Sequence, residues 1–157
     1  MTSLTQVSVE RRDRLMAHVD SLPGLADAIA QGADGAEARL ASEEAFLVTS
    51  LVPLMDATER LLYPELDRLL SCRLAMTPME REHAEVRRLI GQLGCLRTAG
   101  RTDTRAGEVA TVLGRLHALL ASHLADESSY ARILERNVDG VFADALAGAM
   151  PAIPASV

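Results

Sequence analysis

Histidines recur on the apolar faces of three amphipathic patterns, where a protein core normally holds aliphatic side chains. In the last long pattern, steps of four and three residues place His123 and Glu127 among leucines on a single helix face. The same spacing places His83 and His18 among aliphatic residues in two earlier patterns. Burying these groups costs several kcal/mol, as an order of magnitude, unless each polar atom finds a partner. A cation shared between the helices would satisfy all four side chains, so their types and spacing indicate a metal site.

The elements that must position these groups are four long helices. We expect them to run from residue 4 or 9 to 30, from 34 to about 70, from 77 to 98, and from about 103 to 136. Asp34 followed by Glu37 predicts a capping box, and Thr77-Pro78 with Glu80 predicts another helix start of the same kind.

Prolines and a last apolar pattern complete the predicted layout. Pro23 should bend the first helix, and Pro53 and Pro64 should kink the second. A short pattern over residues 141–150 predicts a fifth helix packed against the others.

Length and composition favour one all-α domain. The chain has 157 residues, about the size of one domain, and aromatic residues make up only 3% of it, so residues that favour strands are scarce. Four long helices with short connections predict an antiparallel up-down-up-down four-helix bundle over residues 1–150, followed by a flexible tail over residues 151–157.

Charge and hydropathy exclude several classes of partner. The net charge of −6 is spread along the chain without a Lys/Arg cluster, so no nucleic-acid partner is expected. The N-terminus shows no charged leader followed by an apolar stretch, and no apolar run reaches bilayer length. These features predict a soluble, cytoplasmic protein that does not bind membranes. Cys72 and Cys95 are expected to be ordinary thiols.

Three stretches of the chain carry a family resemblance: residues 51–64, residues 81–86 and residues 116–127. Together they resemble the hemerythrin-like, or HHE, domains, and the resemblance extends over about residues 10 to 136. The resemblance implies a four-helix bundle that holds iron between its helices. In the family, helices one and three each give a histidine, and helices two and four each give a His-x-x-x-Glu. The matching residues here are His18, His83, His123 and Glu127.

The second helix departs from the family pattern. Leu54 stands where the resemblance would place a histidine, and Thr58 stands where it would place the bridging glutamate. The four remaining ligands include a single carboxylate, so a full di-iron centre is not expected. We expect one divalent metal, with iron first and zinc, manganese or nickel as alternatives. Leu54 and Thr58 should line a pocket for a small ligand such as dioxygen, peroxide or nitric oxide.

Neighbouring polar residues are assigned supporting roles. Glu59 lies about 100° around the helix from Thr58, so it is expected to hydrogen-bond a ligand or face solvent rather than bind the metal. Tyr63 and Tyr130 could hydrogen-bond near the site, although packing at a bundle end is the commoner fate of such residues. His117 faces a different side from His123 and is expected to have no part in the site.

Two other classes of function stay open from the sequence. The four polar groups could form a buried network without metal in a bundle that binds a partner or regulates one. Alternatively, an enzyme could use the remodelled pocket, and the sequence does not decide whether there is turnover. A homodimer is also open, because seams between helices and seams between subunits look alike in a sequence.

Overall fold

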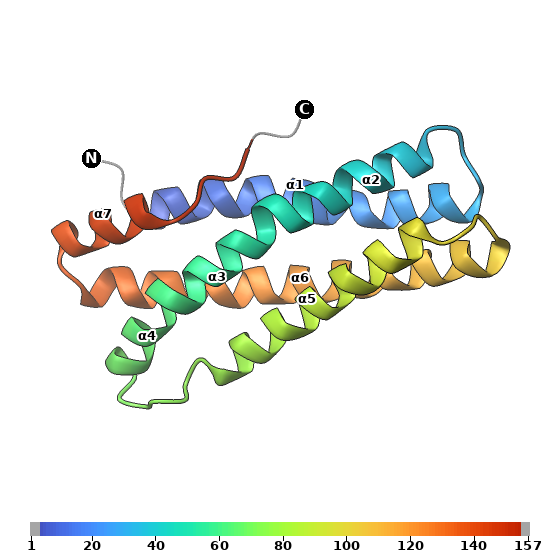
Figure 1. Cartoon of the computed structure of the whole chain (residues 1–157). Helices are drawn as coiled ribbons and strands as arrows, with labels where there is room; N and C mark the ends of the chain where they lie inside the picture. The colour runs from blue at the N-terminus through green and yellow to red at the C-terminus, as the bar shows by residue number, and fades with distance from the viewer. Residues whose placement is uncertain (1–3, 155–157) are drawn as a thin grey trace.

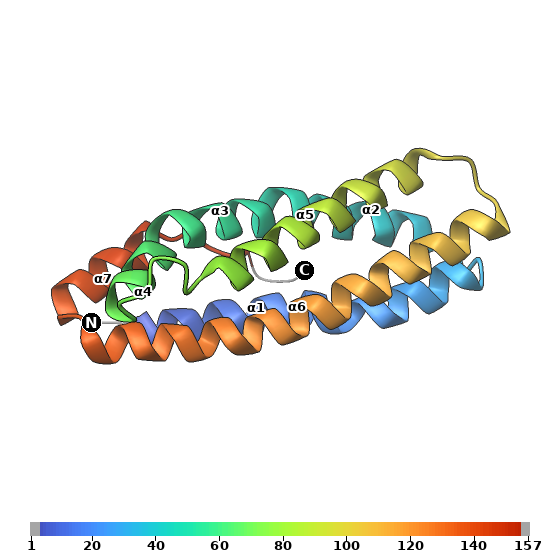
Figure 2. The same cartoon turned by 90° about the horizontal axis from the view of Figure 1, so that it is seen from below.

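The protein is an antiparallel bundle of four long helical rods, described for residues 4–154 of the computed structural model (Figures 1 and 2). The rods run up, down, up and down in chain order, as predicted. The first rod is α1 (Leu4–Ala30), the third is α5 (Thr77–Thr98) and the fourth is α6 (Asp103–Asn137). The second rod is built from α2 (Ala36–Phe46), a π-helix (Leu47–Leu51), α3 (Val52–Leu61) and α4 (Tyr63–Leu69).

The all-α prediction is confirmed, including the short fifth helix. That helix is α7 (Gly140–Ala149), which starts at Asp139, whose Oδ1 accepts the Phe142 N–H at 2.8 Å. No strand occurs in the part of the chain that the structure describes. None of its helices combines the length and the apolar character needed to cross a bilayer.

The core runs along the whole bundle. Leu22 from α1, Leu40 from α2, Leu93 from α5 and Leu113 from α6 each expose 0% of their surface. In Figures 1 and 2, α1 and α6 lie side by side along most of their length. This pairing, together with that of α5 and α6, fixes the level at which inward side chains from different helices meet.

Two of the predicted helix starts differ in detail. The second rod begins at Ala36 after Gly35, which has φ 76° and makes no side-chain cap, so the capping box at Asp34 does not form. The chain enters this helix through a left-handed glycine, a conformation that glycine adopts without a steric penalty. In α5, Thr77 is already helical and Met76 is the cap residue, whose own N–H donates to Asp67 Oδ1 at 2.9 Å. Thr77 therefore gives no side-chain cap.

The predicted start of α6 is confirmed. Thr102 has an extended backbone, and its Oγ1 accepts the Arg105 N–H at 3.1 Å.

Residues 151–154 follow α7 without helical structure. Ile153 is 2% exposed, and its carbonyl accepts a hydrogen bond from Arg14 Nη1 at 2.8 Å. The described part of the expected tail is therefore packed against α1. Residues 155–157 of that tail lie outside the described residues.

The second rod changes its hydrogen bonding next to its two prolines. The π-helix Leu47–Leu51 comes immediately before the segment that carries Pro53, and α3 gives way to α4 at Leu62, before Pro64. Proline lacks an N–H and crowds the carbonyl four residues earlier, so the regular α pattern cannot continue unchanged there. Beyond the first break, the rod still turns Leu54 and Thr58 inward.

Candidate metal centre

Two histidines from neighbouring helices meet inside the bundle. His83 of α5 and His123 of α6 are 1% and 2% exposed, and their Nε2 atoms lie 2.9 Å apart. The rings are tilted by 50° with their centroids 4.6 Å apart. The two residues meet because they lie at similar distances from the turn that joins α5 to α6.

Each histidine is oriented by a carboxylate at its other ring nitrogen. His83 Nδ1 lies 2.7 Å from Glu59 Oε1, and His123 Nδ1 lies 2.7 Å from Glu82 Oε2. Arg87 Nη1 donates to the same Glu59 oxygen at 2.9 Å and fixes that carboxylate. A carboxylate that accepts from Nδ1–H leaves the Nε2 lone pair free to bind a cation, which is how metal-binding histidines are usually held.

Tyr63 supplies a hydroxyl next to this pair. The side chain is 2% exposed, and its hydroxyl lies 3.3 Å from His83 Nε2. Burial and the nearby Glu127 and Glu59 carboxylates raise the pKa of Tyr63 well above its usual value. The hydroxyl therefore stays protonated and can donate a hydrogen bond to a neighbouring acceptor.

Glu127 is the carboxylate nearest to the facing nitrogens. Its Oε2 lies 3.9 Å from His123 Nε2, and burial raises its pKa, although His123, Thr58 and Arg11 oppose that rise. Thr58 is 1% exposed, and its Oγ1 has no hydrogen-bond partner of normal geometry among the described residues. Leu54, 4% exposed, lines a small cavity beside Glu127. The side of the site that faces α3 thus offers aliphatic and hydroxyl groups.

The donor set fits one metal ion. Two nitrogens that bind a metal at right angles, each about 2.1 Å away, are about 3 Å apart, and the observed 2.9 Å between the Nε2 atoms matches that spacing. Glu127 must move closer to act as a third ligand. Among the described residues, no group of three or more His, Cys, Asp or Glu side chains is already assembled around one point. Leu54 has no donor atom and Thr58 offers only a neutral hydroxyl, so α3 supplies neither the histidine nor the bridging carboxylate that a second metal would need at these positions.

His18 is placed apart from this pair. Its Nδ1 lies 3.0 Å and 3.1 Å from the two Glu43 carboxyl oxygens, and its ring stacks on Phe46 with the centroids 3.4 Å apart. The hydrogen bonds and ion pairs of His83 and His123 do not include it. The half-buried His18 of α1 therefore pairs with Glu43 of α2, whereas the sequence pattern had grouped it with His83, His123 and Glu127.

Some of the residues around the site were not expected from the sequence. Glu59 and Tyr63 contact His83, whereas Tyr130 packs against the core, which was expected to be the commoner fate for both tyrosines. No role was expected from the sequence for Glu82 or Arg11. A usable signal for Glu82 was its place next to His83, because an inward histidine on the neighbouring helix requires an acceptor for its Nδ1–H.

A pH dependence of stability follows from His83. Burial, together with the neighbouring His123, lowers the pKa of His83 from 6.5 to about 4. Between these values the unfolded chain binds more protons than the folded one. The free energy of unfolding of the metal-free protein should therefore fall as the pH is lowered from about 6.5 to about 4, by up to about 3 kcal/mol.

Urea unfolding of the metal-free protein from pH 7 to 4.5 measures this fall. His83→Gln should flatten it. Glu127→Gln should steepen it, because the raised pKa of Glu127 acts in the opposite sense. If the free energy of unfolding of His83→Gln falls with pH as steeply as that of the wild type, groups other than His83 cause the fall.

Comparison with known proteins identifies one matching family. The model of the hemerythrin HHE cation-binding domain matches residues 12–131, a range that includes both histidines, their carboxylate partners and Glu127. No curated protein and no solved structure matches the chain significantly.

Proposed function

Because the chain belongs to the family of hemerythrin HHE cation-binding domains, we propose that it binds one metal ion, iron in the first place, through His83, His123 and Glu127. The observation that carries the proposal is the pair of buried Nε2 atoms that face each other at 2.9 Å. With both Nδ1 atoms turned to carboxylates, two lone pairs meet in a dry interior. They repel each other unless a proton or a cation lies between them.

The surrounding charges support a cation at this point. Glu127 is a half-buried carboxylate that forms an ion pair with His123 at 3.9 Å. A divalent ion bound by two neutral imidazoles would offset its charge and remove the cost of its desolvation. Thr58 Oγ1 is a further buried polar atom on the same side, and it interacts with the Glu127 carboxyl without making a hydrogen bond of normal geometry among the described residues.

The residues around the ion would each have a defined task. An iron ion held by two histidines and one carboxylate supplies open coordination positions for a small molecule such as dioxygen, peroxide or nitric oxide. Glu59 and Glu82 orient the imidazoles through their Nδ1 atoms, and Tyr63 holds a proton within reach of the same space. Leu54 keeps the adjoining side apolar and limits the entry of water.

Elemental analysis of the purified protein after anaerobic loading with Fe(II) tests the proposal. About one equivalent of iron per chain is expected from a set of three protein ligands. The spectrum in the ultraviolet and visible range, first under nitrogen and then in air, reports whether the ion reacts with dioxygen. A content below about a tenth of an equivalent for every transition metal would exclude a metal-based role.

One observation favours a second candidate, a metal-free bundle with a binding or regulatory role. The Nε2 atoms at 2.9 Å also suit a hydrogen bond between two neutral imidazoles, with one ring donating Nε2–H to the other. That arrangement leaves one Nδ1 without a proton opposite its carboxylate. This cost places the metal-free candidate second, and the same elemental analysis separates the two.

A further inference from the structure

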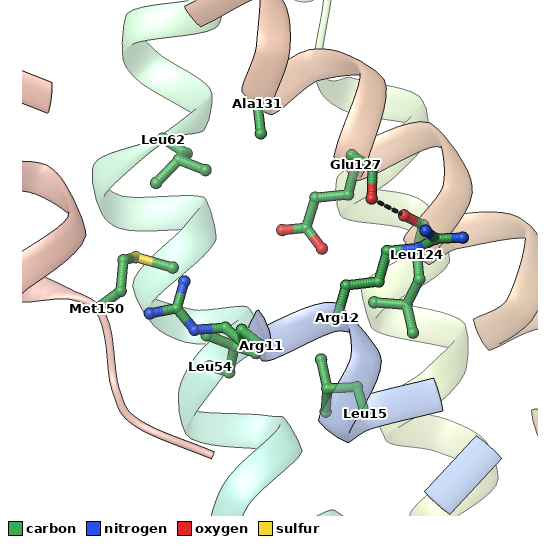
Figure 3. A pocket seen from close by; sticks show the side chains of 10 residues that line it. Arg11, Arg12, Leu15, Leu54, Leu62, Leu124, Glu127, Ala131 and Met150 are labelled. Carbon is green, nitrogen blue, oxygen red and sulfur yellow. Dashed lines mark hydrogen bonds between the residues drawn. The ribbon is translucent and has the colours of Figure 1, made fainter. Parts of the chain in front are cut away.

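A small, partly open pocket adjoins the metal centre on the side of α1 and α7. It measures about 40 Å³, and its apolar lining includes Leu54, Leu62, Leu124 and Met150. Its polar lining is Arg11, Arg12, Ser128 and the Glu127 carboxyl, which points into it (Figure 3). The two arginines leave α1 in different directions, Arg11 towards Met150 and Arg12 towards Leu124.

Both arginines lack a counter-charge at ion-pair distance. Among the described residues, four arginines are buried or half-buried: Arg11, Arg12, Arg87 and Arg105. Arg87 and Arg105 are paired with carboxylates, at 2.9 Å and 2.7 Å. Within the same described part of the chain, Arg11 and Arg12 form no ion pair, and Arg12 Nε is buried without a hydrogen-bond partner.

The partial burial of Arg11 affects the pKa of its guanidinium. Desolvation lowers the pKa of Arg11, and the charge of Glu127 offsets this only in part. A guanidinium that has lost part of its hydration without gaining a carboxylate at ion-pair distance carries a desolvation cost that is only partly compensated. An anion at this position would remove that cost.

Arg11 is also reachable from solvent. A second hollow of about 210 Å³ opens between α1 and α7 and is lined by Arg14, Ala147 and Ile153. Arg11 and Met150 line both this hollow and the smaller pocket beside Glu127. The guanidinium therefore lies where an open groove passes into an apolar interior.

We propose that Arg11, with Arg12 beside it, binds the carboxylate of a short alkyl carboxylate, and that the alkyl group enters the small pocket beside Glu127. The planar guanidinium matches a carboxylate with two parallel hydrogen bonds. At about 10–15 Å³ per water-sized group, the cavity holds about three such groups, enough for the alkyl end of a three- or four-carbon acid. Glu127 repels the charged end, so the carboxylate stays at Arg11. The site requires no metal and goes beyond the proposed function.

The test is a titration of the metal-free full chain with propionate, followed by NMR spectra of its backbone amides. Propionate should shift signals of α1, α7 and the cavity-facing part of α6 and reach saturation, whereas the uncharged isostere propionamide should not. Arg11→Gln should weaken propionate binding at least about tenfold. This fold-change corresponds to the loss of a hydrogen bond to a charged group. Arg60→Gln is the matched control, because Arg60 is exposed on α3 and does not line the cavity.

The outcomes that would overturn the inference are distinct from a failure of the metal site. Equal shifts with propionamide would reveal a purely apolar pocket. Unchanged affinity in Arg11→Gln would place the carboxylate elsewhere. Binding that appears only after iron loading, and survives in Arg11→Gln, would place it on the metal. A protein that binds propionate through Arg11 but takes up no iron would support this site while contradicting the proposed function.

Discussion

Replacing His123 with alanine is expected to abolish metal binding. His123 supplies one of the two facing Nε2 atoms, is 2% exposed, and is the histidine closest to Glu127. Its loss leaves one imidazole and one carboxylate, which is too few protein ligands to hold a divalent ion against water. Affinity should fall by more than the roughly 10- to 100-fold that follows the loss of a supporting hydrogen bond. Elemental analysis after anaerobic Fe(II) loading measures the change.

His117→Ala is the matched control for this variant. His117 lies on the same helix, is half-buried, and makes none of the contacts that hold the pair. Metal content should stay at the wild-type value in this variant. Circular dichroism of both variants checks that the helices persist. If His123→Ala retains iron, the ion is held elsewhere, and the carboxylate-backed histidines form a structural network.

The helical layout followed from the sequence because each rod buries one continuous apolar stripe. That periodicity also predicted that His83 and His123 lie opposite each other along the bundle axis. Both residues are a similar number of residues away from the short turn that joins α5 to α6. Helix ends were less accessible to prediction. The start at Ala36 is set by the left-handed Gly35 rather than by the side chain of Asp34, and local pattern alone does not choose between these two solutions.

The surroundings of the site could be predicted only in part. The inward positions of Leu54 and Thr58 follow from helix periodicity. The partner of His18 does not follow from periodicity, because a half-buried side chain at the edge of the apolar face of α1 can turn towards either neighbouring helix. Its pairing with Glu43 depends on how α1 and α2 pack. The roles of Arg11 and Glu82 likewise depend on contacts between elements far apart in sequence.

Leu54→His combined with Thr58→Glu is expected to raise the iron content from about one to about two per chain. Both positions face the interior from α3, at 4% and 1% exposure, and Thr58 affects the Glu127 carboxyl directly. The new imidazole and carboxylate would supply the helix-two donors that the resemblance to the hemerythrin-like family implies. An oxo-bridged pair should then add near-ultraviolet bands that the parent protein lacks. Elemental analysis and absorption spectra in air measure both effects.

The same substitution should make the fold depend on metal. Without a cation, a glutamate at position 58 would lie near Glu127, and two buried carboxylates destabilise each other. The metal-free variant should therefore unfold at lower urea concentration than wild type and recover when iron is added. Leu54→Gln with Thr58→Gln is the size-matched control, because amides neither repel Glu127 nor bridge two metals. Iron content and spectrum that match this control would mean that α3 does not present these positions to the metal.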